Sequence, residues 1–209
     1  MESMQLTDQL TIFTRYPEPG HTKTRLISAL GEEGAAALQK ELTEKTLQKV
    51  EQLVKTSTIE PVICFEGGDL DTMQNWLGPD RLYKPQVHGD LGKKLKKAFN
   101  EAFSGGAHRV VTIGCDCPGL CREHISRAFD ALYFKDLVLG PATDGGYYLI
   151  GIKYPIEELF EDIPWGTDKV FEKTVSLAQH LGLSIEILEE LHDVDRPEDL
   201  RHIDHNSDS

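Results

Sequence analysis

Two kinds of hydrophobic pattern alternate along this chain of 209 residues. Short runs of apolar, often β-branched residues are typical of buried strands. Between them, apolar residues recur every three or four positions, as they do on one face of an amphipathic helix. The pattern predicts strands at 10–14, 61–65, 81–86, 109–114, 137–140, 147–152 and 184–188. It predicts helices at 34–55, 69–77, 90–103, 122–134, 168–181 and 197–203.

This alternation predicts the fold class. Near-continuous apolar strands separated by helices are typical of a sheet that is covered on both faces. We therefore expect an α/β protein with three α/β/α layers and a mainly parallel, mixed sheet. The length suits one domain, expected over residues 1–204, followed by a polar tail at 205–209. Ligands of such sheets bind beyond the carboxyl ends of the strands, where the motif loops described next are expected.

Composition narrows the possible partners. The net charge of −13 argues against a nucleic-acid partner, because phosphate backbones are bound by basic faces. A membrane span is not expected, since no apolar run is long enough to cross a bilayer. The first residues do not resemble a signal peptide, so a cytoplasmic location is expected. The four cysteines lack zinc spacing and predict reduced thiols, the alternative being a redox or metal role for Cys115 and Cys117.

The loop after the first predicted strand has the features of a phosphate-binding loop. It contains two prolines, Gly20, and the cations Lys23 and Arg25, just before a helical pattern. Helix N-termini favour anions through their free N–H groups and dipole. The spacing matches neither a nucleotide P-loop nor a dinucleotide fingerprint. The alternative is an exposed turn with solubilising charges. The predicted nucleotide- and phosphate-binding residues are Arg15, Pro19, Gly20, Lys23, Arg25, Gln86 and Asp90.

Acidic residues follow two further strands. Asp116 lies directly after the strand at 109–114, and Asp193 and Asp195 are two residues apart near the C-terminus. Carboxylates are the ligands that Mg²⁺ and Mn²⁺ prefer, usually together with substrate phosphates. Asp116, Asp193 and Asp195 are therefore the predicted metal ligands. The alternative is that Asp116 caps a turn or helix and that Asp195 caps the helix at 197–203.

Two glycine-containing turns are candidates for the acceptor or sugar site. Asp144 precedes two glycines and is able to accept hydrogen bonds from a sugar hydroxyl or a base, although the same residues suit a plain hairpin turn. Trp165 is predicted to be an aromatic wall over a sugar ring, the alternative being core packing. The candidates are Asp144, Gly145, Gly146, Tyr147, Trp165, Gly166 and Thr167. Four lysines, Lys93, Lys94, Lys96 and Lys97, are expected to form a solvated helix face rather than a binding patch.

Together these stretches resemble a known bacterial family of predicted transferases. They are Pro17-Glu-Pro-Gly-His-Thr-Lys-Thr-Arg-Leu26, Gly89-Asp-Leu-Gly92, Ile113-Gly-Cys-Asp-Cys-Pro-Gly-Leu120, residues 140–151, Ile163-Pro-Trp-Gly-Thr167 and Asp193-Val-Asp-Arg-Pro-Glu-Asp-Leu200. The resemblance is to nucleotide-diphospho-sugar transferases of GT-A type, including arsenosugar-biosynthesis and radical-SAM/selenodomain-associated glycosyltransferases. A more distant likeness is to 2-phospho-lactate guanylyltransferase, through Lys23-Thr-Arg-Leu26. The resemblance implies the GT-A, Rossmann-like fold of that family.

The expected activity is metal-dependent glycosyl transfer from a nucleotide-diphospho-sugar to a small-molecule acceptor. Lys23, Arg25, Asp116 and Asp144 are the predicted catalytic residues, with Mg²⁺ or Mn²⁺ as cofactor. One alternative is a nucleotidyltransferase that joins an NTP to a phosphorylated small molecule and releases pyrophosphate. The other is a non-catalytic nucleotide-binding protein.

Overall fold

A computed structural model describes residues 7–203, so the predicted tail at 205–209 lies outside the described residues. One seven-stranded sheet has the order β3-β2-β1-β4-β6-β5-β7. The strands are β1 (Thr7–Arg15), β2 (Ile59–Glu66), β3 (Leu82–Pro85), β4 (Ala107–Gly114), β5 (Leu137–Pro141), β6 (Tyr147–Ile152) and β7 (Ile185–Ile187). Within residues 7–203, β6 alone runs against its neighbours, β4 and β5, while the other pairs are parallel. The predicted mainly parallel, mixed sheet is confirmed.

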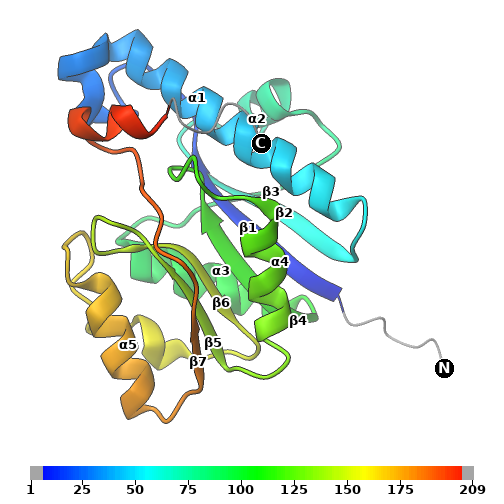
Figure 1. Cartoon of the computed structure of the whole chain (residues 1–209). Coiled ribbons are helices and arrows are strands. Elements are labelled where there is room, and N and C mark those ends of the chain that lie inside the picture. The colour runs from blue at the N-terminus through cyan, green and yellow to red at the C-terminus, as the bar shows by residue number, and fades with distance from the viewer. Residues whose placement is uncertain (1–6, 204–209) are drawn as a thin grey trace.

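Helices cover both faces of the sheet (Figure 1). The helices are α1 (Ile27–Val54), α2 (Leu70–Leu77), α3 (Leu91–Ser104), α4 (Arg122–Ala131) and α5 (Val170–His180). Three short 3₁₀ helices are η1 (Thr24–Leu26), η2 (Glu157–Phe160) and η3 (Pro197–His202). Buried side chains of α1, α2 and α4 pack in one core cluster, and those of α3, η2 and α5 pack in another. The three predicted layers are therefore present.

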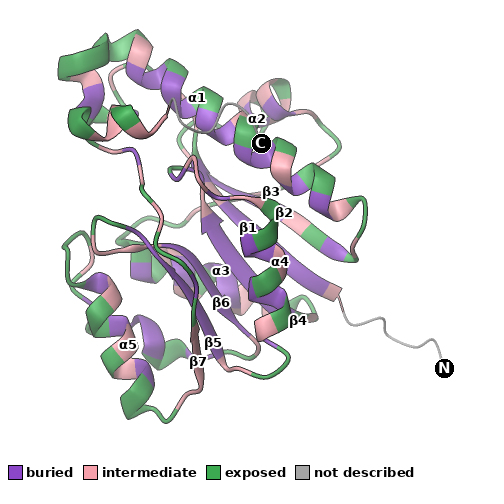
Figure 2. Cartoon of the chain, viewed as in Figure 1, coloured by how far each residue is buried: buried purple, intermediate pink, exposed green. Residues whose placement is uncertain are grey.

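The strands form the core between these layers. Figure 2 shows the strands mostly buried, whereas the helices expose one face to solvent. Leu10 and Ile12 on β1 pack toward the α1 side, and Val110 on β4 packs toward the α3 side. Each of the three is fully buried. This alternation follows from the period of two along a strand.

The structure shifts several predicted boundaries. Helix α1 begins at Ile27 rather than residue 34, and it continues through a kink at Gly31, whose φ of 71° breaks the helical geometry. Helix α4 ends at Ala131, and the next residues form turns instead of extending it to 134. The last predicted helix is the 3₁₀ helix η3. Hydrophobic periodicity locates these segments well, but their ends depend on local hydrogen bonds.

The hairpin of β5 and β6 decides which loops meet. Strand β6 is antiparallel to β4, so its first residue, Tyr147, lies at the edge where β4 and β5 end. The turn between β5 and β6 is the hairpin turn that Asp144, Gly145 and Gly146 were expected to form. Gly145 has a φ of 88°, and a Cβ there would lie 2.3 Å from the backbone oxygen of Asp168. Only glycine therefore lets this turn pack against the start of α5.

The C-terminal segment returns across the molecule to α1 (Figure 1). After β7 the chain passes the carboxyl end of β4, and η3 lies beside the beginning of α1. Val194 is fully buried in a small core cluster with Leu26 and Leu38. The backbone N–H of Val194 donates to the carbonyl oxygen of Asp116 at 2.9 Å. The segment that contains Asp193 and Asp195 is thereby fixed next to Asp116.

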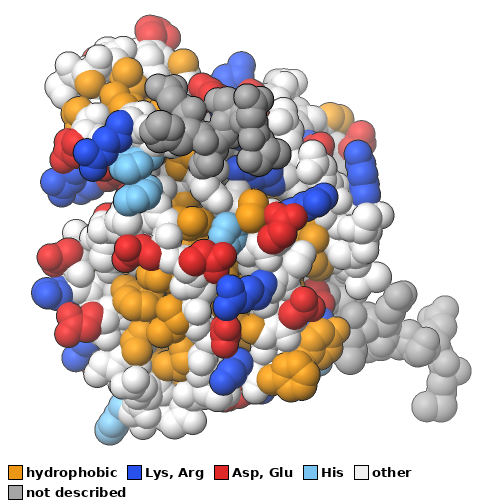
Figure 3. Space-filling view, in the orientation of Figure 1, with side chains coloured by type: hydrophobic (Ala, Val, Ile, Leu, Met, Phe, Trp, Pro, Cys, Tyr) orange, Lys and Arg blue, Asp and Glu red, His pale blue; other side chains and the backbone are white. Residues whose placement is uncertain are grey.

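The surface carries acidic, basic and hydrophobic side chains, as Figure 3 shows for one face. On the face in Figure 3, hydrophobic side chains gather between α5 and β7, and acidic side chains lie above them. Strand β7 is at the edge of the sheet, and Ile187 on it is 48% exposed. None of the helices within residues 7–203 is both long and apolar enough to cross a membrane.

Candidate active site

A cavity of about 860 Å³ lies at the carboxyl ends of β4 and β5, and we call it the central cavity. Ten residues predicted for the site line it: Arg25, Asp116, Asp144, Gly146, Tyr147, Trp165, Gly166, Thr167, Asp193 and Asp195. They come from segments far apart in the sequence. The topology brings them together because the parallel strands end at this edge and β6 begins there. Cavities of this size hold small-molecule ligands.

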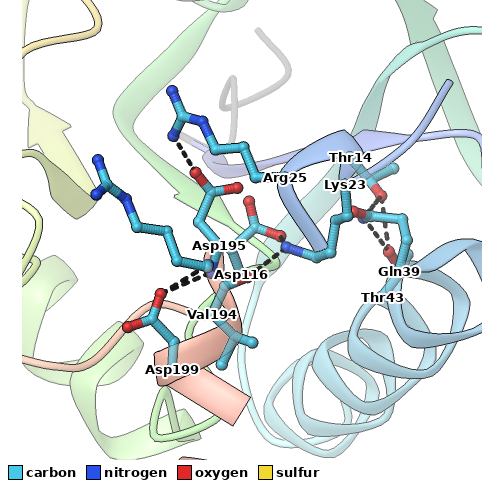
Figure 4. Close-up of polar contacts among 10 residues, drawn as sticks. Thr14, Lys23, Arg25, Gln39, Thr43, Asp116, Val194, Asp195 and Asp199 are labelled. Carbon is cyan, nitrogen blue, oxygen red and sulfur yellow. Dashed lines mark hydrogen bonds and ion pairs between the residues drawn. The ribbon is translucent and has the colours of Figure 1, made fainter. Parts of the chain in front are cut away.

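Lys23 reaches the site from the side of the first loop. Its Nζ donates to Oδ1 of Asp116 and to the carbonyl oxygen of Val194, each at 2.7 Å (Figure 4). The backbone of Lys23 is left-handed, with a φ of 46°, and its side chain is only 3% exposed. Lys23 thus joins the first loop, the loop after β4 and the C-terminal segment.

Arg25 lies two residues further on and forms a second ion pair. Its Nη1 donates to Oδ2 of Asp195, and both side chains are partly exposed (Figure 4). Asp199 holds the same segment in place, because its Oδ2 accepts hydrogen bonds from the backbone N–H groups of Asp195 and Arg196. Lys23 and Arg25 are therefore each paired with a predicted metal ligand, whereas Arg15, the third predicted phosphate-binding cation, is paired with Glu66.

The two capping alternatives are wrong for the helices. The N-cap of α4 is Cys121, not Asp116, and the N-cap of η3 is Arg196, not Asp195. Asp116 and Asp195 are left to face the central cavity, where their side chains are 52% and 36% exposed. The structure thus assigns neither carboxylate to helix capping.

Neighbouring carboxylates repel one another in the central cavity. Burial and the charge of Asp144 raise the pKa of Asp193 to about 6. Burial also raises the pKa of the Cys117 thiol well above its usual range, and the charge of Asp193 adds to the shift. Within residues 7–203, no group of three His, Cys, Asp or Glu side chains is arranged to hold a metal by itself. A hard cation bound by one or two of these carboxylates would need further oxygen ligands, such as substrate phosphates.

Asp144 and Trp165 each have the structural role that was the alternative for them, and each also lines the central cavity. Oδ1 of Asp144 accepts from the backbone N–H of Gly146 at 2.8 Å, as in a turn, yet the residue also lines the central cavity. Trp165 packs against the α3-side core and lines the cavity as well. Its ring meets Tyr147 edge-on, with centroids 6.4 Å apart. Being part of the core keeps the Trp165 ring fixed at the cavity wall.

A smaller hollow of about 220 Å³ shares Asp116 with the central cavity, and we call it the Gln86 hollow. Of the predicted residues, Arg15 and Gln86 line it together with Asp116. Nε2 of Gln86 donates to the carbonyl oxygens of Cys64 at 2.9 Å and Thr14 at 3.4 Å. Both partners are carbonyls, so the amide nitrogen must face them and the amide oxygen is directed elsewhere.

Sequence reasoning missed two charged residues of the Gln86 hollow, Glu66 and Lys94. Oε2 of Glu66 accepts from Nη2 of Arg15 at 2.5 Å and from Nζ of Lys94 at 2.8 Å. The Lys94 side chain is only 13% exposed, so its expected place on a solvated face is wrong. The position of Glu66 at the carboxyl end of β2 was the available signal. The buried polar group of Gln39, Thr14 and Thr43 beside this hollow was also missed (Figure 4).

Five predicted residues lie outside the lining of both spaces. One is Lys23, whose contacts are described above. Pro19 is exposed, and Gly20 lies beside the Glu32 carboxylate. Oδ1 of Asp90 accepts from the backbone N–H of Lys93 and caps α3. Gly145 supports the packing of its turn, as described above. Cys115 and Cys117 are buried and free, as expected for reduced thiols.

Solved structures with the same architecture include three informative examples. A protein of Desulfovibrio desulfuricans G20 named "putative nucleotide-diphospho-sugar transferase" is 34% identical, over 97% of this chain and 88% of its own, with a TM-score of 0.90. The 4-diphosphocytidyl-2C-methyl-D-erythritol synthase of Anaerococcus prevotii DSM 20548 is 12% identical, over 96% and 95%, with a TM-score of 0.61. Rv0371c of Mycobacterium tuberculosis H37Rv, in complex with manganese, is 14% identical, over 95% and 98%, with a TM-score of 0.55. The last two likenesses show the fold alone.

These findings confirm the nucleotide-diphospho-sugar transferase type of fold, which nucleotidyltransferases share. The narrower resemblance to arsenosugar or selenodomain-associated enzymes stays a prediction. No curated protein matches the chain. The family model described as "Uncharacterized protein conserved in bacteria (DUF2064)" matches residues 46–167, more than half of the chain. The chain therefore belongs to the DUF2064 family.

Proposed function

We propose that this protein is a metal-dependent transferase that moves a glycosyl group from a nucleotide-diphospho-sugar to a small-molecule acceptor. The observation that supports this most is the pairing of two cations with two carboxylates beside the central cavity, Lys23 with Asp116 and Arg25 with Asp195. A diphosphate and its metal ion need both kinds of group at one place. The 34% identity to the Desulfovibrio protein adds support for a nucleotide-sugar donor.

The carboxylates suit a divalent cation chemically. Asp116, Asp193 and Asp195 provide hard oxygen donors on one cavity, where burial and then the charge of neighbouring Asp144 raise the pKa of Asp193. Such a set of donors favours Mg²⁺ or Mn²⁺ over softer metals. When bound, the ion would neutralise charge that develops on the diphosphate leaving group.

The side chains of the chain itself have separate roles in this proposal. Arg25, which is 62% exposed, swings from Asp195 to the diphosphate oxygens. Lys23 stays almost buried and holds the Asp116 carboxylate and the Val194 carbonyl in place. Lys23 is therefore a positioning residue, and its charge also acts on the diphosphate across Asp116. Asp144 accepts a hydrogen bond from a hydroxyl group of the sugar or the acceptor, and Trp165 forms an apolar wall for the sugar ring.

The second candidate is nucleotidyl transfer, in which a phosphorylated substrate attacks the α-phosphate of an NTP and pyrophosphate leaves. The Lys23-Thr-Arg25 loop favours it, because three phosphates need at least as much positive charge as two. The Gln86 hollow lies beside the same Asp116 and offers room for part of a nucleotide. The released product separates the two candidates.

The test combines thermal-shift screening with product analysis. Purified protein is mixed with nucleotide sugars and NTPs, each with Mg²⁺, with Mn²⁺ or with a chelator. A ligand at a hundred times its Kd adds about 2.7 kcal/mol of stability. A metal-dependent shift with one nucleotide sugar, and release of its nucleoside diphosphate, is the expected result. A shift with an NTP and release of pyrophosphate would favour the second candidate, and no shift with either class would refute both.

Asp116→Asn tests the site within the same assays. The variant is expected to remove metal-dependent ligand shifts and turnover by at least about a hundredfold, because it removes the charge that faces both spaces. Its fold should remain, since the side chain is half exposed. Asp130→Asn, on the exposed face of α4, is the matched control and should leave both readouts unchanged. Full turnover by Asp116→Asn would rule out the proposed metal site.

A further inference from the structure

The ends of three neighbouring strands place a row of polar side chains in the Gln86 hollow. Arg15 at the end of β1 is paired in register with Glu66 at the end of β2. Phe65 and Pro85 are paired between β2 and β3, and the backbone N–H of Gln86 donates to the carbonyl oxygen of Phe65 at 2.7 Å. Glu66 and Gln86 are therefore side by side, and both line the hollow with Arg15. Neighbouring strands lie about 4.8 Å apart, so one ligand group is able to contact Glu66 and Gln86 together.

The side-chain amide of Gln86 is held in one orientation. Its two N–H groups have two acceptors, the carbonyl oxygens of Cys64 and Thr14. A carbonyl donates no hydrogen bond, so exchanging the amide nitrogen and oxygen would lose both bonds. Within residues 7–203, Oε1 of Gln86 makes no hydrogen bond, and it is not one of the buried side-chain atoms that lack one. Gln86 therefore presents an accessible acceptor whose position is fixed by the strand ends.

Glu66 adds a second acceptor beside Gln86. Oε2 of Glu66 accepts from Arg15 and Lys94, and Oε1 takes part in neither bond. Burial alone would raise the pKa of Glu66, but the hydrogen bonds from Lys94 and Arg15 hold it below its usual value. Glu66 is therefore a carboxylate with one oxygen engaged by cations and the other left to accept. Two neighbouring acceptor oxygens match a ligand group that has two N–H donors.

The charges of the Gln86 hollow balance one another. Its lining contains two cations, Arg15 and Lys94, and two carboxylates, Glu66 and Asp116. Arg15 and Lys94 are both paired with Glu66, and Asp116 is paired with Lys23. The lining thus has no unpaired cation for a phosphate group and no unpaired carboxylate for a cation. An uncharged polar group fits this balance, and the base is the uncharged part of a nucleotide.

The Gln86 hollow adjoins the central cavity. Phe13, Leu91 and Asp116 line both spaces. Phe13 packs against the α3-side core cluster, and Leu91 is 41% exposed. These two side chains provide an apolar surface for a flat ring, and Asp116 lies between the hollow and the proposed diphosphate site. A nucleotide whose diphosphate lies at Asp116 therefore has its base within reach of the hollow.

From the two neighbouring acceptors and the balanced charge, we infer that the Gln86 hollow selects a nucleotide whose base carries an exocyclic amino group. That group, present in cytosine, adenine and guanine, has two N–H donors, one for Oε1 of Gln86 and one for Oε1 of Glu66. Uracil has a single N–H between two carbonyl oxygens, and those oxygens are repelled by the acceptors of the hollow. The inference rests on the proposed function, which supplies the nucleotide, and it excludes a uridine nucleotide as the donor.

The test compares nucleotides that differ at the amino group. CDP and UDP have the same charge and nearly the same size, but cytosine has an amino group where uracil has a carbonyl oxygen. GDP and ADP extend the comparison to purines, and inorganic pyrophosphate is the probe without a base. Isothermal titration calorimetry measures each in the presence of Mn²⁺. The tightest of CDP, GDP and ADP is expected to bind at least about tenfold more tightly than UDP, because UDP leaves the two acceptors unpaired.

Two variants assign the preference to Gln86. Gln86→Met removes the acceptor oxygen, and Gln86→Lys removes it but keeps N–H donors for the carbonyl oxygens of Cys64 and Thr14. Both should reduce the preference over UDP to less than about threefold, and Gln86→Met should leave pyrophosphate binding unchanged. The charge added by Gln86→Lys cancels in the comparison, because the four nucleotides have the same diphosphate. Gln52→Met, at an exposed position of α1, is the matched control and should keep the full preference.

The binding pattern separates this inference from the proposed function. UDP binding as tight as that of the other three nucleotides, or a preference that survives in a folded Gln86 variant, would overturn the inference and leave the nucleotide-sugar donor in place. A preference that both variants lose supports the inference. The same preference among NTPs, without turnover of any nucleotide sugar, would refute glycosyl transfer and still support the selection of the base. Absence of binding by every nucleotide would overturn both.

Discussion

Replacing Lys23 tests whether this side chain holds three segments of the structure together. Its ammonium group makes two hydrogen bonds of 2.7 Å, to a carboxylate of the loop after β4 and to a carbonyl of the C-terminal segment. Lys23→Met keeps an unbranched, flexible side chain that is one atom shorter, and it removes both hydrogen bonds. The backbone at Lys23 is left-handed, but lysine and methionine are equally strained there, so that strain cancels in the comparison.

The loss of stability expected for Lys23→Met depends on how exposed the two hydrogen-bond partners of Lys23 are. A hydrogen bond to a charged group contributes about 1.5–3 kcal/mol, and a buried carbonyl left without its partner costs about 1–3 kcal/mol. Asp116 is 52% exposed, so water replaces part of what it loses. Removing a nearly buried ammonium also relieves its desolvation cost. The net loss should be about 2 kcal/mol, which lowers the Tm by about 4–8 °C in a chain of this size.

Arg25→Met is the matched comparison. The Arg25–Asp195 pair is 62% and 36% exposed, and exposed ion pairs contribute less than about 1 kcal/mol. Urea unfolding of both variants measures the difference, and hydrogen exchange locates it. Lys23→Met should increase amide exchange at Val194 and the residues that follow, whereas Arg25→Met should not. Equal stability of Lys23→Met and the unaltered protein, or an equal loss in Arg25→Met, would refute the role of Lys23 as the link between three segments.

Two further predictions concern Gly92 and Asp136. Gly92→Ala places a Cβ 2.3 Å from the present position of Nε1 of Trp165, so Trp165 must move. Trp165 fluorescence, measured in a protein whose other tryptophan carries the substitution Trp76→Phe, should shift, and an unchanged emission spectrum would contradict the packing. Burial alone would raise the pKa of Asp136, but hydrogen bonds from Ser184 and Lys153 hold it below its usual range. Because the pKa is lower in the folded state than the value of about 3.9 in the unfolded chain, this stabilisation is present above about pH 4 and is lost as the pH falls further. Asp136→Asn should therefore be less stable than the unaltered protein at neutral pH and lose less stability on acidification, in urea unfolding curves recorded across pH; parallel pH profiles of the two proteins would show that the carboxylate contributes nothing.

Several site residues could be found from the sequence because their positions depend on short-range features. Asp116 follows an apolar strand directly, and Asp144 lies in a glycine-rich turn between two strands. A parallel sheet gathers its strand ends at one edge, so a residue just after a strand is placed without knowledge of the tertiary structure. The same reasoning placed Trp165 in a turn before α5. Boundaries were less certain, as the early start of α1 shows, because helix ends depend on individual hydrogen bonds.

Other residues could not be predicted because their partners lie far away in the chain. Asp116 and Lys23 are 93 positions apart, and Val194 is 171 positions from Lys23. Lys94 was expected in solvent because it lies off the apolar stripe of α3, but it is mostly buried and forms an ion pair with Glu66. Thr112 is one polar residue in an otherwise apolar strand, and the sequence does not show whether its hydroxyl has a hydrogen-bond partner. Such contacts depend on which elements become neighbours.

The sequence by itself determined the order of strands and helices, the layered α/β class and the set of acidic and basic loops at one edge of the sheet. These follow from hydrophobic period and strand ends, which are local properties of the chain. The tertiary structure alone decided that β6 is reversed between β4 and β5, that Lys23 links Asp116 to Val194, and that Lys94 pairs with Glu66. Those outcomes required distant segments to pack together, because hydrogen bonds and burial between them exist only in the folded molecule.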